Sequence, residues 1–262
     1  MAEITRVFYS SRLEVGDVLR LPEKESYHVY KVLRGRVGDR IEVVDGARRL
    51  FVAELLKGEQ ANITEERTAE DDEGAVTLYQ SVPKGRHMDL VVEKATELGV
   101  GRIVPLGTER GVVRLEDGAG KVRRWRRVAE AAARQSLRLR IPEVDEVISF
   151  PEAVQEAGES GVLLHNGPDL PPLEDVVQAP TVSLFVGPEG GWSEVELTKA
   201  KEASLRFAAL GPFRLRSETA GMVAVARACA ACAFWSARGA SGRAGERERL
   251  GVLQDSTQGE VV

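Results

Sequence analysis

The sequence predicts an α/β protein with a small, strand-rich amino-terminal part and a larger part built on a parallel sheet. Short apolar segments separated by Gly-Asp and Asp-Gly turns fill the first third of the 262 residues. After Gly74, apolar strand segments alternate with helical periods, and this alternation is typical of βα units. With 43% hydrophobic and 29% charged residues, the composition is that of a globular protein rather than a disordered or membrane protein.

The amino-terminal part is predicted to form a small barrel. Its strands are expected at Val15–Arg20, Arg40–Asp45 and Leu50–Leu56. A short helix is expected at His28–Arg34, between the first two of these strands. The acidic run Glu65–Glu73 follows and predicts either a linker or the exposed end of a hairpin. We therefore expect one domain over residues 1–73.

The larger domain is expected over residues 74–239. Its strands are expected at Val76–Val82, Arg102–Leu106, Gly161–His165, Thr181–Val186 and Arg206–Leu210. Helices are expected at Met88–Leu98, Lys121–Leu139 and Thr219–Trp235. The last helix is apolar nearly all round, which indicates that it is buried on both sides. A dimer interface is one way to bury its second side. Residues 240–262 are expected to form a flexible tail.

A Gly-rich segment, Leu184–Trp192, leaves a predicted strand and enters a helix. Ser193 and Glu196 form a capping box, which predicts where that helix begins. Loops at the carboxyl ends of parallel strands bind ligands, and glycines let the backbone approach a ligand closely. An ordinary tight turn explains such a loop equally well.

A second loop, Leu210–Ala220, also follows a strand. Ser217 is predicted to be the N-cap of the next helix, which places Arg216 and Glu218 at the helix entrance. A guanidinium and a carboxylate there can bind an anion or position a proton acceptor. The alternative is a capped helix with a surface ion pair. A third loop, His165–Pro172, is the least specific of the three.

Several common kinds of site are not supported by the sequence. It has neither GxGxxG after a strand nor GxxxxGK[ST], so neither a Rossmann dinucleotide site nor a P-loop is predicted. Cys229 and Cys232 lie in an apolar run and are predicted to be core thiols, and no metal site is expected. The apolar stretches are shorter than the roughly 20 residues that span a bilayer, so no membrane contact is expected. Residues 1–10 lack the apolar core of a secretory signal, and a cytoplasmic protein is expected.

Charge is distributed unevenly along the chain. The formal net charge is −5, yet 28 of the 36 basic residues are Arg, the side chain best suited to bidentate phosphate contacts. Residues Lys121–Arg140 contain eight basic residues and one acid. This run is either the solvated face of a helix or a surface that binds RNA phosphates, as an RNA-modifying enzyme would need.

The order and spacing of several segments resemble the RsmE family of 16S ribosomal RNA uracil-N3 methyltransferases, within the SPOUT class. The segments that carry the resemblance are HVYKVLRGRVGDRIEVVDG, EKATELGV, PLGTERGVVR, RWRRVAEAAARQSLRLRIPEV, FVGPEGGWSEVE and LGPFRLRSETA. The resemblance implies an amino-terminal PUA-like β-barrel that helps bind RNA and a SPOUT α/β domain with a trefoil knot. It also implies S-adenosylmethionine as cofactor and a homodimer that acts on 16S rRNA or the 30S subunit.

Carried onto this chain, the resemblance places the cofactor on the three loops. The residues expected to bind it are Leu164, His165, Val186, Gly187, Gly190, Gly191, Leu210, Gly211 and Leu215. Arg216 is expected to orient the uracil or stabilise the charge that develops on it, and Glu189 or Glu218 to accept the N3 proton. RNA is expected to contact Arg34, Arg36, Arg123, Arg124, Arg127 and Arg138.

Three positions depart from the family's usual pattern. Arg134 stands where an acid is usual, Asn166 where a Glu is usual, and Phe213 with Arg214 where Arg and Ile are usual. Two other functions remain open: another SPOUT enzyme that acts on transfer RNA or a ribose 2′-hydroxyl, and a non-catalytic RNA-binding assembly protein.

Overall fold

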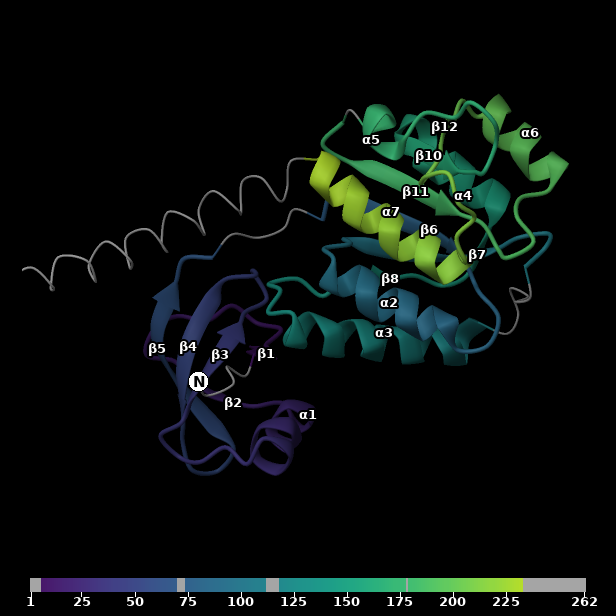
Figure 1. Ribbon diagram of the computed structural model, residues 1–262. Coiled ribbons are helices and arrows are strands. Elements are labelled where there is room, and N and C mark those ends of the chain that lie inside the picture. Colours follow the sequence, from purple (N-terminus) through teal and green to yellow (C-terminus); the bar gives the residue numbers. More distant parts are fainter. Residues whose placement is uncertain (1–5, 70–73, 112–117, 178, 233–262) are drawn as a thin grey trace, which may run out of the picture.

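The computed structural model describes residues 6–69, 74–111, 118–177 and 179–232. They form two sheets with separate hydrophobic cores (Figure 1). The predicted boundary at residue 73 lies outside the described residues. So do the end of the predicted last helix, beyond Cys232, and the predicted tail 240–262.

The amino-terminal sheet has five strands and curls around its own core. Its elements are β1 (Arg6–Phe8), β2 (Val18–Arg20), α1 (Glu23–Ser26), the π-helical turn η1 (Tyr27–Val32), β3 (Arg40–Val44), β4 (Leu50–Leu55) and β5 (Gln60–Arg67). The spatial order is β1-β3-β4-β5-β2; β1 and β3 are parallel and the other neighbours are antiparallel. The predicted strands are confirmed, with the first strand shortened to three residues. A short helix is present, but its residues run from Glu23 to Val32 rather than from His28 to Arg34, and Arg34 has φ +59°.

Two strands of this sheet escaped prediction. β1 has three residues, too few for a periodic pattern. β5 ends in Glu65, Glu66 and Arg67, which are exposed yet still pair with β4. The acidic run therefore begins as the exposed end of a hairpin, which was one of the two predicted alternatives.

The larger sheet is parallel throughout, as predicted. Its elements are β6 (Val76–Ser81), α2 (His87–Glu97), β7 (Arg102–Gly107), α3 (Gly118–Gln135), β8 (Glu143–Val144), β9 (Ile148–Ser149), α4 (Phe150–Ala157), the 3-10 turn η3 (Gly158–Ser160), β10 (Gly161–Leu164), α5 (Leu173–Val176), β11 (Val182–Val186), α6 (Glu194–Glu202), β12 (Arg206–Ala208) and α7 (Ser217–Ala231). The strand order is β12-β10-β11-β6-β7-β8, and β9 pairs with β7.

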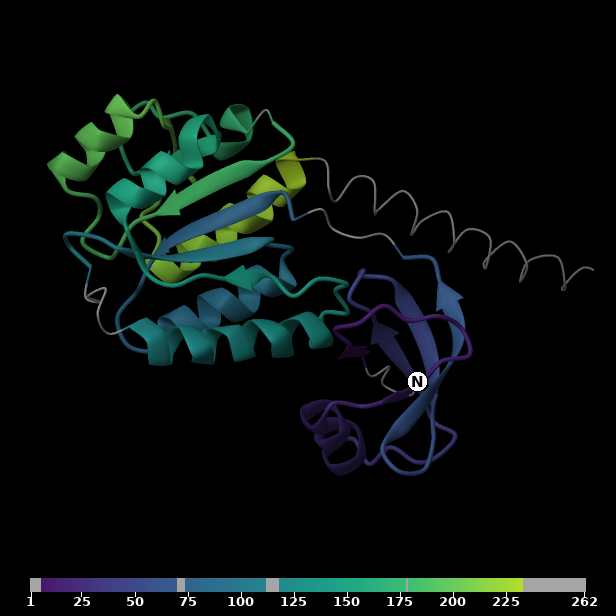
Figure 2. The same cartoon turned by 180° about the vertical axis from the view of Figure 1, so that it is seen from behind.

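Helices cover both faces of this sheet. α2, α3 and α7 lie on one face, and α4 and α6 lie on the other (Figure 1 and Figure 2). The central strand β11 is consequently buried along its whole length, and every residue from Val182 to Val186 is in the core. Among the described residues, no helix combines the length and apolar character needed to cross a membrane.

The two cysteines belong to the α7 side of the core. Cys229 is buried and Cys232 is half-buried, and neither forms a disulfide. Burial raises the pKa of the Cys232 thiol above its usual value. The prediction of core thiols is therefore confirmed for Cys229 and holds in part for Cys232.

The two sheets meet at the carboxyl end of α3. Apolar side chains at this contact are Phe8, Val44, Leu50 and Leu139. Arg6 of β1 donates to the carbonyl oxygen of Leu137 and pairs with Glu42 at 2.5 Å. Arg134 of α3 forms an ion pair with Glu25 of α1. The position that departs from the family's pattern, Arg134, thus helps hold the two parts together.

Candidate active site

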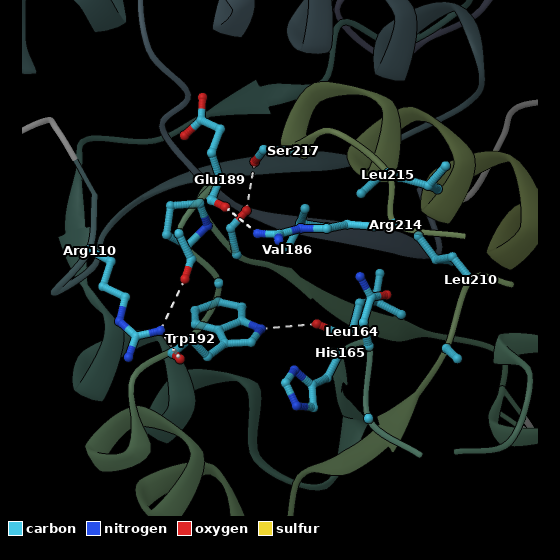
Figure 3. A pocket seen from close by; sticks show the side chains of 18 of the residues that line it. Arg110, Leu164, His165, Val186, Glu189, Trp192, Leu210, Arg214, Leu215 and Ser217 are labelled. Atoms are coloured by element: carbon cyan, nitrogen blue, oxygen red, sulfur yellow. Dashed lines mark hydrogen bonds between the residues drawn. The ribbon is translucent and has the colours of Figure 1, made fainter. Parts of the chain in front are cut away.

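A pocket of about 710 Å³ lies where β10, β11 and β12 end (Figure 3). Its volume is within the usual range of about 300–1,000 Å³ for small-molecule sites. The loops that follow these three strands supply most of the wall. The structure brings together all nine residues predicted to bind the cofactor: Leu164, His165, Val186, Gly187, Gly190, Gly191, Leu210, Gly211 and Leu215.

Strand pairing explains why loops far apart in the sequence meet here. β10 lies between β11 and β12 and is parallel to both, so the carboxyl ends of all three strands share one edge of the sheet. The backbone N–H of His165 donates to the carbonyl oxygen of Ala208 at 3.0 Å, and that of Ala209 donates to Pro171 at 2.9 Å. These bonds extend the pairing into the loops.

Trp192 fixes the Gly-rich loop against the neighbouring strand. Its buried ring nitrogen Nε1 donates to the carbonyl oxygen of Leu164 at 2.9 Å. The ring packs on Gly187, where an added Cβ would lie only 3.0 Å from the Trp192 side chain. Gly191 has φ +69°, a backbone conformation that favours glycine. Close packing and backbone conformation therefore explain two of the glycines.

Two guanidinium groups line the pocket and hold the same loop (Figure 3). Arg110 Nη1 donates to the carbonyl oxygens of Gly190 and Trp192 at 3.0 and 3.1 Å. Arg214 Nη2 donates to the carbonyl oxygen of Glu189 at 2.8 Å. Sequence reasoning assigned no role to either arginine. Both lie in segments that carry the family resemblance, and this position could have indicated that they belong to the site.

The predicted N-cap role of Ser217 is wrong. α7 begins at Ser217 itself, and Arg216 occupies the N-cap position without a side-chain cap. The Ser217 hydroxyl donates to the carbonyl oxygen of Gly187 at 2.6 Å and accepts from Nε2 of the fully buried Gln80 at 2.9 Å. The hydroxyl therefore bonds to residues distant in the sequence and does not cap its own helix. In contrast, the predicted capping box of Ser193 is present.

The three predicted catalytic residues lie in different surroundings. Glu189 is exposed and lines the pocket, and its Oε1 accepts from the backbone N–H of Lys84 at 3.1 Å. Arg216 is exposed, and Glu218 is buried with Oε1 3.7 Å from Nδ1 of His87. Neither Arg216 nor Glu218 is part of the pocket wall.

Five of the six residues predicted to contact RNA lie on the surface, and one does not. Arg34 and Arg36 are exposed on the amino-terminal part, as are Arg123, Arg124 and Arg127 on α3.

Arg138 contradicts the prediction, because it is only 4% exposed. Its Nη1 donates to the carbonyl oxygens of Thr96 and Val100, at 2.9 and 2.8 Å. α3 ends at Gln135, and the chain turns at Leu137, which has φ +56°. This turn directs Arg138 inward to the carboxyl end of α2.

The pocket fits the cofactor that the resemblance implies. Leu164, Val186, Leu210 and Leu215 supply apolar surface for a purine and a thioether chain, and Asn166, Glu189 and Arg214 are polar residues of the same wall. An added Cβ at Gly191 or Gly211 would meet no protein atom within 4 Å. The loop backbone is therefore open to a ligand at these two positions.

Comparison with known proteins gives consistent results. A family model described as an RNA methyltransferase domain matches residues 70–229. Ribosomal RNA small subunit methyltransferase E of Mycobacterium bovis is 32% identical, over 89% of this chain and 95% of its own length. The protein of the same name from Aquifex aeolicus is 31% identical, over 82% of this chain and 94% of its own.

Two solved structures have the same fold over most of their length. Ribosomal RNA small subunit methyltransferase E from Neisseria gonorrhoeae, bound to S-adenosyl methionine, has a TM-score of 0.80 and 31% identity. A putative methyltransferase from Legionella pneumophila, in complex with the same cofactor, has a TM-score of 0.79 and 31% identity. Each match covers 87% of this chain and 98% of the other.

Proposed function

The chain belongs to the RsmE family of ribosomal RNA small subunit methyltransferases, and we propose that it methylates N3 of one uridine in 16S rRNA. As a member of this family it is an enzyme that transfers a methyl group from S-adenosylmethionine to small-subunit ribosomal RNA. The observation that carries the proposal is the pocket, whose wall contains every residue expected to bind the cofactor.

The pocket residues would hold the cofactor between the three loops. When bound, S-adenosylmethionine supplies the methyl group that is transferred. Hydrogen bonds from Trp192, Arg110 and Ser217 fix the loop backbone in advance, which lowers the entropy lost when the reacting atoms align. Their role is to position the loop.

The reaction at uracil N3 needs a proton acceptor, because N3 carries a proton at neutral pH. N3 also lies on the Watson–Crick edge, so the target base must be unpaired or flipped out of a helix. Of the two candidates, Glu189 lines the pocket, whereas Glu218 is buried beside His87. This difference favours Glu189 as the acceptor.

Negative charge develops on the uracil oxygens as the N3 proton leaves. A guanidinium close to these oxygens would stabilise that charge. Arg216 is the candidate from the sequence, and Arg214 is the one of the two that lines the pocket. We therefore propose that Arg214 stabilises this charge, and Arg216 serves as the comparison in the test of residue roles below.

Mass spectrometry of nucleosides tests the reaction. The purified protein is incubated with S-adenosylmethionine and small-subunit RNA that lacks modifications, and the RNA is then digested. N3-methyluridine is the expected product. A ribose-methylated nucleoside, or no methylated nucleoside, would show that the proposed reaction is wrong.

Matched variants test the residue roles. Glu189→Gln should lower kcat by about 10²-fold or more, the usual contribution of a general base, with little change in cofactor affinity. Glu218→Gln should have the smaller effect on kcat. In the same assay Arg214→Ala should lower kcat more than Arg216→Ala. The reverse order in either pair would transfer the role to the other residue.

We also propose the finer architecture that the family implies. The curled five-stranded sheet supports a PUA-like barrel over residues 1–73, followed by a SPOUT domain over 74–239. The family resemblance also implies a knot formed by the carboxyl-terminal segment that includes α7, which follows the edge strand β12, packs against the central strands and pairs Arg227 with Glu174 of α5. Pulling the unfolded chain from both ends would detect a knot as a shortened contour length.

A homodimer in the cytoplasm completes the proposal. Small-subunit RNA lies in the cytoplasm of a bacterium. A second subunit could cover the apolar residues of α7 that are exposed or partly exposed in the single chain. Sedimentation velocity should give about twice the mass of the 28.6 kDa chain, and a monomer would overturn the dimer proposal.

A further inference from the structure

A second cavity, of about 240 Å³, lies between the loop that follows β6 and the amino-terminal ends of α2 and α3. It shares no lining residue with the first pocket. Its floor is apolar and includes Met88 and Trp125, which are 1% and 4% exposed. A cavity with apolar walls focuses the electric field of the charges at its rim.

The rim of this cavity is strongly basic. The residues that line it include four cations, Lys84, Arg86, Lys121 and Arg124, and one acid, Asp89. Arg124 forms an ion pair with Asp89, which neutralises that acid.

The other three rim cations have no ion pair with any residue that the structure describes. Elsewhere on α3, Arg126 pairs with Glu146 and Arg134 pairs with Glu25, whereas the exposed Arg123 and Arg127 likewise have no ion pair with a described residue but do not line this cavity with its apolar floor. Three cations that line one cavity without an acidic partner of their own are suited to binding an anion.

The cavity is connected to the first pocket through one hydrogen bond. Glu189, in the wall of the first pocket, accepts from the backbone N–H of Lys84, which lines the second cavity. An RNA strand that places a base in the first pocket therefore brings its neighbouring phosphates toward this rim.

We propose that the second cavity binds a backbone phosphate of the substrate RNA, beside the nucleotide that enters the first pocket. This inference rests on the proposed function and adds the position of the RNA backbone. Arg86 can donate two parallel hydrogen bonds to phosphate oxygens, and the two lysines act as mobile point charges. The contact positions the strand and does not read its sequence.

A pair of double variants tests the proposal. Lys84→Gln with Lys121→Gln removes two charges from the cavity, and Lys199→Gln with Lys201→Gln removes two exposed charges from α6 on the opposite face of the sheet. RNA affinity is measured for both and for the parent at several salt concentrations. Cofactor affinity is measured by calorimetry, and it also checks that each variant is folded.

The cavity variant should bind small-subunit RNA about tenfold more weakly than the parent. The slope of log affinity against log salt should become shallower by about 1, as expected for the loss of one phosphate contact. KM for RNA should rise by about tenfold with kcat and cofactor affinity nearly unchanged, because the contact is remote from the transferred methyl group. The α6 variant should behave as the parent does.

Two results would overturn the inference. In one, the cavity variant binds RNA with the parent's affinity and salt slope; in the other, the α6 variant loses as much affinity as the cavity variant. Both leave the proposed function intact, because the parent still makes N3-methyluridine. If the parent itself does not modify the RNA, the proposed function fails and this inference fails with it.

Discussion

At its amino-terminal end α3 presents Lys121, Arg123 and Arg127 to solvent, whereas at its carboxyl-terminal end protein encloses Arg134 and, just beyond the helix, Arg138. Both regions are basic, but their surroundings differ. Arg134 contacts Glu25 and Glu130, and Arg138 contacts backbone carbonyls. The amino-terminal cations can exchange water for phosphate, while the carboxyl-terminal ones already bond to carboxylates and carbonyl oxygens of the protein.

The physical difference lies in desolvation. A guanidinium that is removed from water must keep its donors occupied, so its partners become part of the folded structure. An exposed guanidinium stays hydrated and adds little to the free energy of unfolding. We therefore expect the effect of substitution on stability to fall steadily from the carboxyl-terminal end of this run to its amino-terminal end.

Arg138→Met should have the largest effect and lower the free energy of unfolding by about 3 kcal/mol. The change leaves the carbonyl oxygens of Thr96 and Val100 without this buried donor. Urea unfolding followed by circular dichroism measures the loss, and RNA affinity of the folded variant should match the parent's. A stable variant with weakened RNA binding would instead restore Arg138 to the RNA surface.

Arg134→Ala should lower the free energy of unfolding by about 2 kcal/mol, because Glu25 would remain nearly buried without its guanidinium partner. Arg126→Ala is the matched control on the same helix. Arg126 pairs with the exposed Glu146, so its loss should cost less than about 1 kcal/mol. Equal losses in the two variants would show that enclosure at the domain contact has no energetic consequence.

The pH dependence of stability sharpens the same comparison. Burial raises the pKa of the Glu25 carboxyl above its ordinary value of 4.5, and the nearby Arg134 opposes this shift. Folded protein then holds this proton more tightly than unfolded protein does. The tighter binding of this proton contributes to the free energy of unfolding in full below pH 4.5, and the contribution is lost as the pH rises through the raised pKa of Glu25.

Glu25→Gln removes this dependence. The free energy of unfolding of the parent minus that of Glu25→Gln should therefore decrease as the pH rises from about 4.5 to 7. Urea unfolding of both proteins at a series of pH values measures the difference. An increase over the same range would mean that pairing with Arg134 outweighs burial.

The sequence predicted the parts of the fold that depend on local pattern. Alternating strand and helix segments gave the parallel sheet, and Ser193 with Glu196 gave the start of α6. The three ligand loops followed because parallel strands end at one edge. In each case the information lies in the local pattern of one element or in the order of elements along the chain.

The features that escaped prediction depend on partners distant in the chain. Ser217 bonds to Gly187 and Gln80 instead of capping its own helix, and Arg138 turns inward because of the backbone at Leu137. A run of eight basic residues contains no information on which of them meet an acid in the folded protein. Tertiary contacts decide this.

Arg123→Gln combined with Arg127→Gln should have the smallest effect on stability, within about 0.5 kcal/mol, because both side chains are exposed. The same change should weaken binding to RNA and reduce the salt slope by up to about 1 for each lost phosphate contact. Filter binding at several salt concentrations measures both quantities. If this variant loses stability but keeps its salt slope, the exposed end of α3 is structural, and the contrast between the two ends of the helix disappears.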